Sequence, residues 1–244
     1  MPESPIAVLF DLDDTISDHL ASMRAGVAGI KRRHTDLFAD VSFERLLHLH
    51  SDILEAMHLR MLDGEVTRDE ARVLRTQELF AMFGRPLTVP EAEDLYVEYR
   101  ADYDDAADVV PGTYALLDAL KEQGIRMGIV TNNLVREQLE KLEQLKLSHY
   151  FEMLAISEEV GVAKPDPVIF DVALERMELN GGDVVMIGNS LESDVAGAIA
   201  AGIDVVWLDR LSEGAAAAPP EVKAVVSTDL SDTPTVLAAL LERR

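Results

Sequence analysis

Three uninterrupted apolar runs of this chain each end in a short cluster of polar residues. The runs occupy residues 6–10, 127–130 and 184–187, and the clusters after them occupy residues 11–15, 131–133 and 188–194. Another polar cluster, the third of four in chain order, occupies residues 164–167. Short apolar runs bounded by turn residues are typical of strands buried on both faces of a parallel sheet. Because the reactive crevice of an open α/β sheet lies beyond the carboxyl ends of its strands, we expect the clusters to converge at one edge.

The chain is strongly acidic. Its 244 residues include 45 Asp and Glu against 22 Lys and Arg, which gives a formal net charge of −23. A surface of this sign repels polyanions and argues against a nucleic-acid polymer or an anionic membrane as a partner. A small phosphorylated substrate stays compatible with it, because a local site can reverse the sign of the field. The chain has no cysteine, which excludes disulfides and thiolate metal sites.

The apolar runs are short. None approaches the length needed to cross a membrane, and the first residues lack the basic and apolar regions of a secretory leader. We therefore expect a cytoplasmic protein. The sequence leaves its oligomeric state open.

The spacing of the apolar residues changes between the first two runs. From about residue 18 to residue 105 it is helical, and two capping boxes, Thr67 with Glu70 and Thr88 with Glu91, indicate helix starts. From residue 106 onward helices and strands alternate, with an N-cap at Asp166 and further strands expected at residues 205–208 and 224–226. This order predicts an α/β fold. A doubly wound, Rossmann-like parallel sheet would form from residues 1–17 and 106–244, with about four helices inserted as an all-helical domain at residues 18–105.

The first three clusters carry groups suited to nucleophilic chemistry on an anion. A turn after the first strand can bring Asp11 and Asp13 into one pocket, where one carboxylate attacks an electrophile and the other handles protons. Thr131 opens the turn before the next helix, so its hydroxyl and the following amides can form an anion cradle. Lys164 precedes a rigid Pro-Asp-Pro turn and can hold a phosphate as a point charge. Turn and capping roles for these residues stay open at this point.

The last cluster is rich in oxygen donors. Asn189 supplies an amide oxygen, and Asp194 lies in the first turn of a helix expected to begin near residue 192, where it would also complement the helix dipole. Carboxylates beside a neutral amide oxygen suit Mg²⁺, which takes few protein ligands and keeps several waters. Mg²⁺ is therefore the cofactor that we expect.

The order and spacing of the four clusters resemble those of the haloacid dehalogenase (HAD) superfamily over most of the chain. The family pattern is Asp-x-Asp-x-Thr, then Ser or Thr after the second motif strand, then Lys, then an acidic pair. The resemblance implies that Asp11 is the phosphorylated nucleophile and that Asp13 is the general acid and base. It also implies that Thr131 and Lys164 bind the transferring phosphoryl group.

The resemblance further implies a metal site and a cap domain. Mg²⁺ would be held by Asp11, the backbone carbonyl of Asp13, Asn189 and Asp194. The inserted helices match the family's helical C1-type cap, which closes over the crevice and selects the substrate. Residues 62–70, with the later arginines, resemble the branch that holds the pyrimidine 5′-nucleotidases and N-acylneuraminate-9-phosphatase.

These implications predict a Mg²⁺-dependent phosphomonoesterase acting on a small phosphorylated metabolite, such as a nucleoside monophosphate or a sugar phosphate, through an aspartyl-phosphate. One position departs from the family pattern, because the fourth motif begins Gly188-Asn189 where Gly-Asp is usual. An amide at that position removes one negative charge from the metal shell. This departure leaves open a 2-haloacid dehalogenase and a weakly active or non-catalytic binding protein on the same scaffold. A phosphomutase also stays open, because it shares the phosphoaspartate chemistry.

Overall fold

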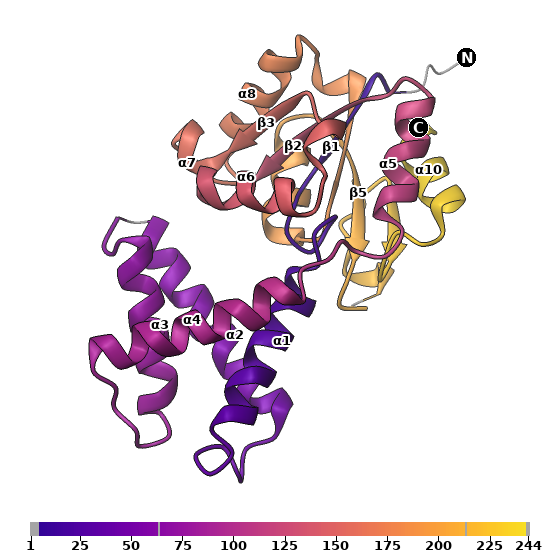
Figure 1. Cartoon of the computed structure of the whole chain (residues 1–244). Helices are drawn as coiled ribbons and strands as arrows, with labels where there is room; N and C mark the ends of the chain where they lie inside the picture. The colour runs from indigo at the N-terminus through magenta and orange to yellow at the C-terminus, as the bar shows by residue number, and fades with distance from the viewer. Residues whose placement is uncertain (1–4, 63, 213, 243–244) are drawn as a thin grey trace. The chain divides into compact units, whose positions relative to one another are not determined.

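The computed structural model of the chain describes residues 5–62, 64–212 and 214–242. The chain forms two compact units, which are coloured by residue number in Figure 1. One unit comprises the residues up to Asp18 together with those from Asp108 onward, and the other comprises His19–Ala107. The boundaries expected from the sequence lay after residues 17 and 105, and the role of the second unit as a cap stays a prediction.

The first unit is built on a parallel sheet. Its six strands are β1 (Ala7–Phe10), β2 (Arg126–Thr131), β3 (Met153–Ile156), β4 (Val184–Gly188), β5 (Asp204–Asp209) and β6 (Ala224–Ser227). The strand order is β3-β2-β1-β4-β5-β6, and every pairing is parallel. The predicted α/β, Rossmann-like class is confirmed. Because β1 lies between β2 and β4, the first polar cluster leaves the sheet where the strand order reverses, the usual place of a ligand site.

Helices and short turns connect the strands. The helices of this unit are α5 (Thr113–Glu122), α6 (Val135–Gln144), α7 (Ser157–Val160), α8 (Pro167–Met177), α9 (Ala196–Ala200) and α10 (Thr233–Leu241). A π-helical turn, η3 (Leu191–Val195), precedes α9, and short 3₁₀ turns lie at Ser148–Tyr150, Gly181–Asp183 and Ala215–Ala217. The N-cap predicted at Asp166 is confirmed, since its carboxylate accepts a 3.0 Å hydrogen bond from the backbone N–H of Val168.

Both faces of the sheet are covered. On one face, Leu9 and Met186 belong to the same buried cluster as Phe170 of α8 and Ala198 of α9. Val8 and Phe10 point to the opposite face, because side chains alternate along a strand, and they are fully buried too. Helices α5 and α10 pack against each other (Figure 1). Burial on both faces explains why β1 is an uninterrupted apolar run in the sequence.

The second unit consists of helices in its described part. These are α1 (His19–Arg33), α2 (Phe43–Leu62), α3 (Arg68–Ala81) and α4 (Val89–Asp105). The side chains of Leu46, Met57, Leu79 and Phe80 share one buried core, as their helical spacing predicted.

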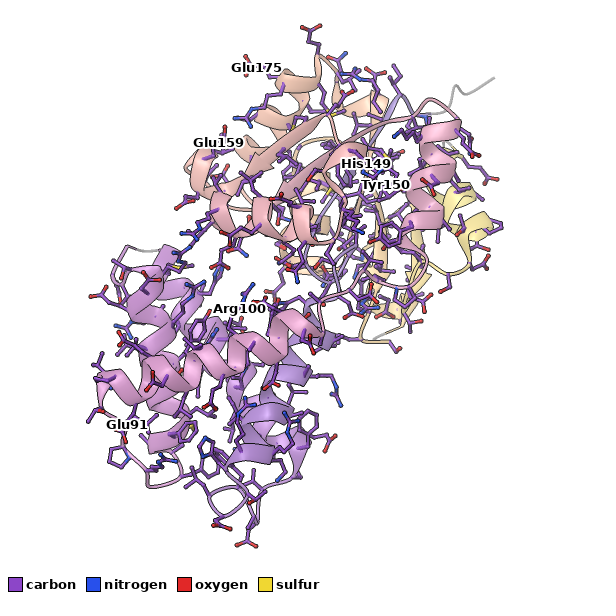
Figure 2. All side chains as sticks on the ribbon, viewed as in Figure 1. Glu91, Arg100, His149, Tyr150, Glu159 and Glu175 are labelled. Carbon is purple, nitrogen blue, oxygen red and sulfur yellow. The ribbon has the colours of Figure 1, made fainter. Side chains whose placement is uncertain are left out.

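Both predicted capping boxes close helix starts in this unit. At the start of α3, the Glu70 carboxylate accepts from the backbone N–H of Thr67 at 2.8 Å, and the Thr67 hydroxyl accepts from the backbone N–H of Glu70 at 3.3 Å. At the start of α4, Glu91 accepts from the backbone N–H of Thr88 at 2.8 Å (Figure 2). Across the described residues, the helices lack the length and apolarity that crossing a membrane would need.

Gly112 allows a close approach between two segments of the first unit. It has a φ of 88°, and a Cβ built on it would lie 2.2 Å from the backbone carbonyl of Leu230. Gly124 has a φ of 72° but no atom within 4 Å of the same position.

We therefore expect Gly112→Ala to destabilise the protein more than Gly124→Ala. Both substitutions place a side chain in the left-handed region, at a cost of about 1–3 kcal/mol. Gly112→Ala adds overpacking against backbone, which costs about 1–3 kcal/mol more. Urea unfolding of the two variants measures the difference, and equal losses would show that the approach to Leu230 is not tight.

Candidate active site

The carboxyl ends of three neighbouring strands meet at the predicted edge. Asp11 follows β1, Thr131 ends β2, and Asn189 follows β4. The first cluster is tied to the sheet by a 3.0 Å hydrogen bond from the backbone N–H of Asp11 to the carbonyl of Ile187.

The chain turns sharply after Asp11. Ser17 donates from its backbone N–H to the carbonyl of Leu12 at 2.9 Å, and Asp14 donates to the carbonyl of Ser17 at 2.7 Å. Asp14 has a φ of 60°, a left-handed conformation that aspartate tolerates better than most residues. This local fold gives the turn that the sequence required for Asp11 and Asp13 to act together.

Lys164 lies at the centre of the site. Its Nζ donates to Asp11 Oδ1 at 2.6 Å, to Asp194 Oδ1 at 2.6 Å and to the carbonyl of Val130 at 2.8 Å. The side chains of Lys164, Asp11 and Asp194 are only 2%, 8% and 1% exposed, so solvent screens these pairs little. An ammonium has three donors, and here each of them has an acceptor. Direct binding of a phosphoryl oxygen would require Lys164 to release one of these partners.

The backbone of Lys164 is held as firmly as its side chain. Asn132 accepts from the backbone N–H of Lys164 at 2.7 Å through Oδ1, and its Nδ2 donates to the carbonyl of Lys164 at 2.9 Å. This reciprocal pair fixes the lysine to the end of β2. The sequence analysis did not assign Asn132 a role, although its place beside Thr131 in the second cluster was a signal.

The buried charges of the site do not balance. Burial raises the pKa of Asp11 to about 7, although the Lys164 ammonium opposes the shift, and the Asp194 carboxylate adds to it. Burial acts against the charge of Lys164, but the two carboxylates outweigh it, so its pKa is raised and the ammonium persists. Two carboxylates facing one ammonium leave a negative charge in excess when both are ionised. Such a cluster favours uptake of a proton or a cation.

Asp13 and Thr131 are joined through helix α6. Gln138 Nε2 donates to Asp13 Oδ2 at 3.0 Å and to Thr131 Oγ1 at 3.0 Å, and the Lys141 ammonium pairs with Asp13 Oδ1. Sequence reasoning missed both α6 residues. Their spacing of three places them on one helix face, but many charged pairs on exposed helices have the same spacing.

The anion cradle predicted after Thr131 is largely closed. The backbone N–H of Asn133 donates to Ser157 Oγ at 3.0 Å, and that of Val135 donates to the Glu158 carboxylate at 2.7 Å. The N–H of Leu134 donates to the side chain of Asn133 at 2.8 Å. These three amides at the start of α6 are therefore already satisfied, and the prediction that the amides after Thr131 bind an anion is wrong for them.

The fourth cluster contributes one buried carboxylate and one amide. Asp194 uses both oxygens, because Oδ2 accepts from the backbone N–H of Ser190 at 3.0 Å while Oδ1 faces Lys164. The Thr15 hydroxyl lies 3.1 Å from Asp11 Oδ2 and 3.2 Å from Asn189 Oδ1. A single hydroxyl thus brings the second oxygen of Asp11 near the amide oxygen of Asn189.

This donor set fits a hard cation with few protein ligands. Asp11 Oδ2 and Asn189 Oδ1 are oxygens of the kind that Mg²⁺ prefers, and the excess negative charge described above favours a cation. Among the described residues there is no cluster of three or more His, Asp or Glu side chains that could enclose a metal by themselves. Waters and the substrate would complete such a shell.

Comparison with known proteins identifies the family. The profile described as haloacid dehalogenase-like hydrolase matches residues 7–202. The chain belongs to this family. The resemblance derived from the four clusters is confirmed.

Individual HAD proteins resemble this chain over different fractions of its length. A ribulose-1,5-bisphosphate 5-phosphatase of Halopiger xanaduensis is 32% identical over 214 residues, which cover 85% of this chain and 86% of that protein. The pyrimidine 5′-nucleotidase YjjG of Escherichia coli is 44% identical over 101 residues, which cover 41% of this chain and 44% of that protein. The structure of the HAD-hydrolase YfnB from Bacillus subtilis, bound to magnesium, matches 96% of this chain and 99% of its own with a TM-score of 0.72. At 24% identity, that last likeness shows the shared fold.

Gly188 makes room for the buried carboxylate of this HAD protein. A Cβ built on Gly188 would lie 2.4 Å from Asp194 Oδ2. Gly188→Ala must therefore displace Asp194 from Lys164, and breaking a buried pair costs about 3–5 kcal/mol. We expect urea unfolding to show a loss of that order. Gly182→Ala, whose Cβ meets nothing within 4 Å, is the matched control. Equal losses in the two variants would mean that Asp194 can move freely.

Proposed function

We propose that the protein is a Mg²⁺-dependent phosphatase that hydrolyses a small phosphorylated metabolite through an aspartyl-phosphate. The observation that carries the proposal is the pairing of two aspartates in different surroundings at one sheet edge. Asp11 is 8% exposed and faces Lys164, whereas Asp13 is 25% exposed and faces Lys141. A buried carboxylate suits the nucleophile, and a carboxylate nearer to solvent suits proton transfer with the leaving group and water.

The reaction needs two displacements at phosphorus. In the first, an oxygen of Asp11 attacks the phosphorus, the bond to the substrate oxygen breaks, and Asp13 gives its proton to the departing alkoxide. In the second, Asp13 takes a proton from water, the resulting hydroxide attacks the phosphorus of the aspartyl-phosphate, and the Asp11 carboxylate leaves. The products are an alcohol and inorganic phosphate, and Asp13 ends each turnover protonated as it began.

The remaining residues supply charge and orientation. Lys164 holds Asp11 in place through Oδ1 and balances part of the charge near the phosphoryl group. Thr131 would donate its hydroxyl hydrogen to a phosphoryl oxygen. Asp11, the carbonyl of Asp13, Asn189 and Asp194 would hold Mg²⁺. When bound, the metal supplies charge stabilisation of the transferring phosphoryl oxygens.

The substrate class is inferred from the relatives and the insertion. The ribulose-1,5-bisphosphate 5-phosphatase and the pyrimidine 5′-nucleotidase are named for a sugar phosphate and for nucleotides. We assign this chain a substrate of the same size, either a nucleoside monophosphate or a sugar phosphate. The helical unit, inserted between the first two clusters, is assigned the role of the cap that selects it.

One residue favours a second candidate, a 2-haloacid dehalogenase. That branch resembles this chain in carrying Asn in its last polar cluster. It differs in lacking the second aspartate of the first cluster, the position of Asp13 here. The two functions are separated by measuring phosphate release from p-nitrophenyl phosphate with Mg²⁺ and with EDTA, and halide release from a 2-haloalkanoate. Metal-dependent phosphate release supports the phosphatase, and metal-independent halide release supports the dehalogenase.

Asp11→Asn tests the nucleophile. The amide is nearly isosteric but a poor nucleophile, so we expect turnover of p-nitrophenyl phosphate to fall by at least about a hundredfold, or roughly 2.7 kcal/mol. The fold should persist, because the variant leaves Lys164 paired with Asp194. Thermal unfolding checks this point. Retention of more than about a tenth of the activity, a loss below roughly 1.4 kcal/mol, would exclude covalent catalysis by Asp11.

Asn189→Asp tests the metal shell. Adding a carboxylate beside Asp11 should lower the Mg²⁺ concentration that gives half-maximal activity, because cation affinity rises with ligand charge. Activity at saturating metal need not rise, since the amide oxygen already lies in place. Gln123→Glu, at the exposed C-terminal end of α5, adds the same charge away from the site. A midpoint that is unchanged in Asn189→Asp, or that shifts equally in both variants, would exclude Asn189 as a ligand.

A further inference from the structure

We propose that Gln138 and Lys141 of α6 are positioning residues that orient Asp13 and Thr131 for phosphoryl transfer. This inference rests on the proposed function and adds two residues to its machinery. Each oxygen of Asp13 has its own donor on α6, with Lys141 at Oδ1 and Gln138 at Oδ2. A carboxylate held at both oxygens cannot rotate freely. Asp13 is therefore fixed in direction, although its side chain is 25% exposed.

The orientation of the Gln138 amide follows from the charge of Asp13. Between the two displacements Asp13 is ionised, and an ionised carboxylate accepts hydrogen bonds and donates none, so the NH₂ group of Gln138 faces Asp13 at that stage. The same NH₂ group then donates to Thr131 Oγ1 at 3.0 Å. The charge on Asp13 thus sets the orientation of the Gln138 amide. That orientation makes Gln138 the hydrogen-bond donor to the Thr131 hydroxyl oxygen.

The consequence concerns the hydrogen of the Thr131 hydroxyl. Because its oxygen accepts from Gln138, its single hydrogen is left to donate elsewhere. Among the described residues, the hydroxyl hydrogen of Thr131 has no acceptor, and the side chain lies 1% exposed at the end of β2. A hydrogen-bond donor kept available at this position is what a phosphoryl oxygen beside Asp11 would need.

The buried amide of Gln138 costs folding free energy, and packing alone does not explain why an amide occupies this position. The residue is 0% exposed, and its Oε1 is buried without a hydrogen-bond donor in the described chain. An unsatisfied buried acceptor costs about 1–3 kcal/mol. An apolar residue of similar size would fill the same space without that cost. The amide is therefore explained by what its NH₂ group does at Asp13 and Thr131.

The Lys141 contact differs from an ordinary surface pair of the same helix. The side chains of Lys141 and Asp13 are 15% and 25% exposed, whereas those of Arg136 and Glu140 are 72% and 58% exposed. Exposed pairs contribute little, and partly buried ones are screened less by salt. Lys141 is thus placed to hold Asp13 and to keep a positive charge beside the leaving group.

The test uses Gln138→Met, which keeps the side-chain length, and Lys141→Met, which shortens the side chain by one atom; both remove the hydrogen-bond donors. We expect kcat for poor alkyl leaving groups to fall by roughly tenfold to a hundredfold, the size of effect that misplacing a catalytic group produces. The loss should be smaller for p-nitrophenyl phosphate, because its acidic leaving group needs little help from Asp13. Lys141→Arg should restore most of the activity. The melting temperature of Gln138→Met should stay the same or rise, since the orphaned Oε1 is removed.

A double-mutant cycle tests the link to Thr131. If Gln138 acts through that hydroxyl, Gln138→Met combined with Thr131→Val should lose less than the product of the two single losses. Lys146→Met, which removes an exposed lysine just beyond α6, is the control and should keep wild-type kinetics and stability.

The results that would contradict the proposed function differ from those that would contradict only the roles of Gln138 and Lys141. A wild-type protein that releases no phosphate from any ester would overturn the proposed function and this inference with it. An active wild type whose α6 variants lose the same factor for every leaving group, lose only stability, or gain activity would overturn this inference alone. If Gln138→Met does not fold, the comparison of Lys141→Met with Lys141→Arg decides the question.

Discussion

The buried ammonium of Lys164 holds the sheet edge together. It binds Asp11 after β1, the carbonyl of Val130 in β2 and Asp194 after β4, each within 2.8 Å. Removing ions of this kind from water costs several kcal/mol each, and only close opposite charges and hydrogen bonds offset that cost. The three central strand ends are therefore joined by the groups that we propose for the chemistry. Substitutions there should disturb stability and activity together, so a near-isosteric variant such as Asp11→Asn is needed to separate the two effects.

The same cluster has the charge that would attract the cation we propose for the site. With Asp11 and Asp194 ionised, the single ammonium leaves a negative charge uncompensated in a region that solvent hardly reaches. A proton on Asp11 would remove that charge, in keeping with the raised pKa of this residue, but would also remove the carboxylate that we propose as the nucleophile. A bound cation would balance the charge and keep the carboxylate ionised. Asn189 stands where the family usually has Asp, so the site has one negative charge fewer with which to attract a cation. Its amide still places an oxygen near Asp11.

The sequence predicts this fold well where one physical rule dominates. Strands β1, β2 and β4 are buried on both faces, so each is a continuous apolar run, and their carboxyl ends must meet. The edge strand β3 (Met153–Ile156) is also an apolar run of four residues, but it was not located individually, because so short a run fits a buried helical turn as well as a strand. The contacts of Gln138 and Lys141 were not foreseeable either. Asp13 and Gln138 are 125 residues apart, and the charge pattern of α6 is that of any solvated helix. The amides after Thr131 were misjudged because Glu158, from helix α7 after β3, accepts a hydrogen bond from one of them.

The acidic charge of the whole chain sharpens the question of how an anionic substrate is held. In the described part of the site, Lys141 and Lys164 are the ammonium groups in contact with the candidate aspartates, and both are already paired with them. Neither offers an unpaired charge to a phosphoryl group in a protein of net charge −23. The groups left to bind the phosphoryl group are the hydroxyl hydrogen of Thr131 and the cation that we propose at Asp11 Oδ2 and Asn189 Oδ1. Affinity for the phosphoryl group should therefore depend on the metal more strongly than in a site with an unpaired lysine. On this view Gln138 matters because it keeps the Thr131 donor available.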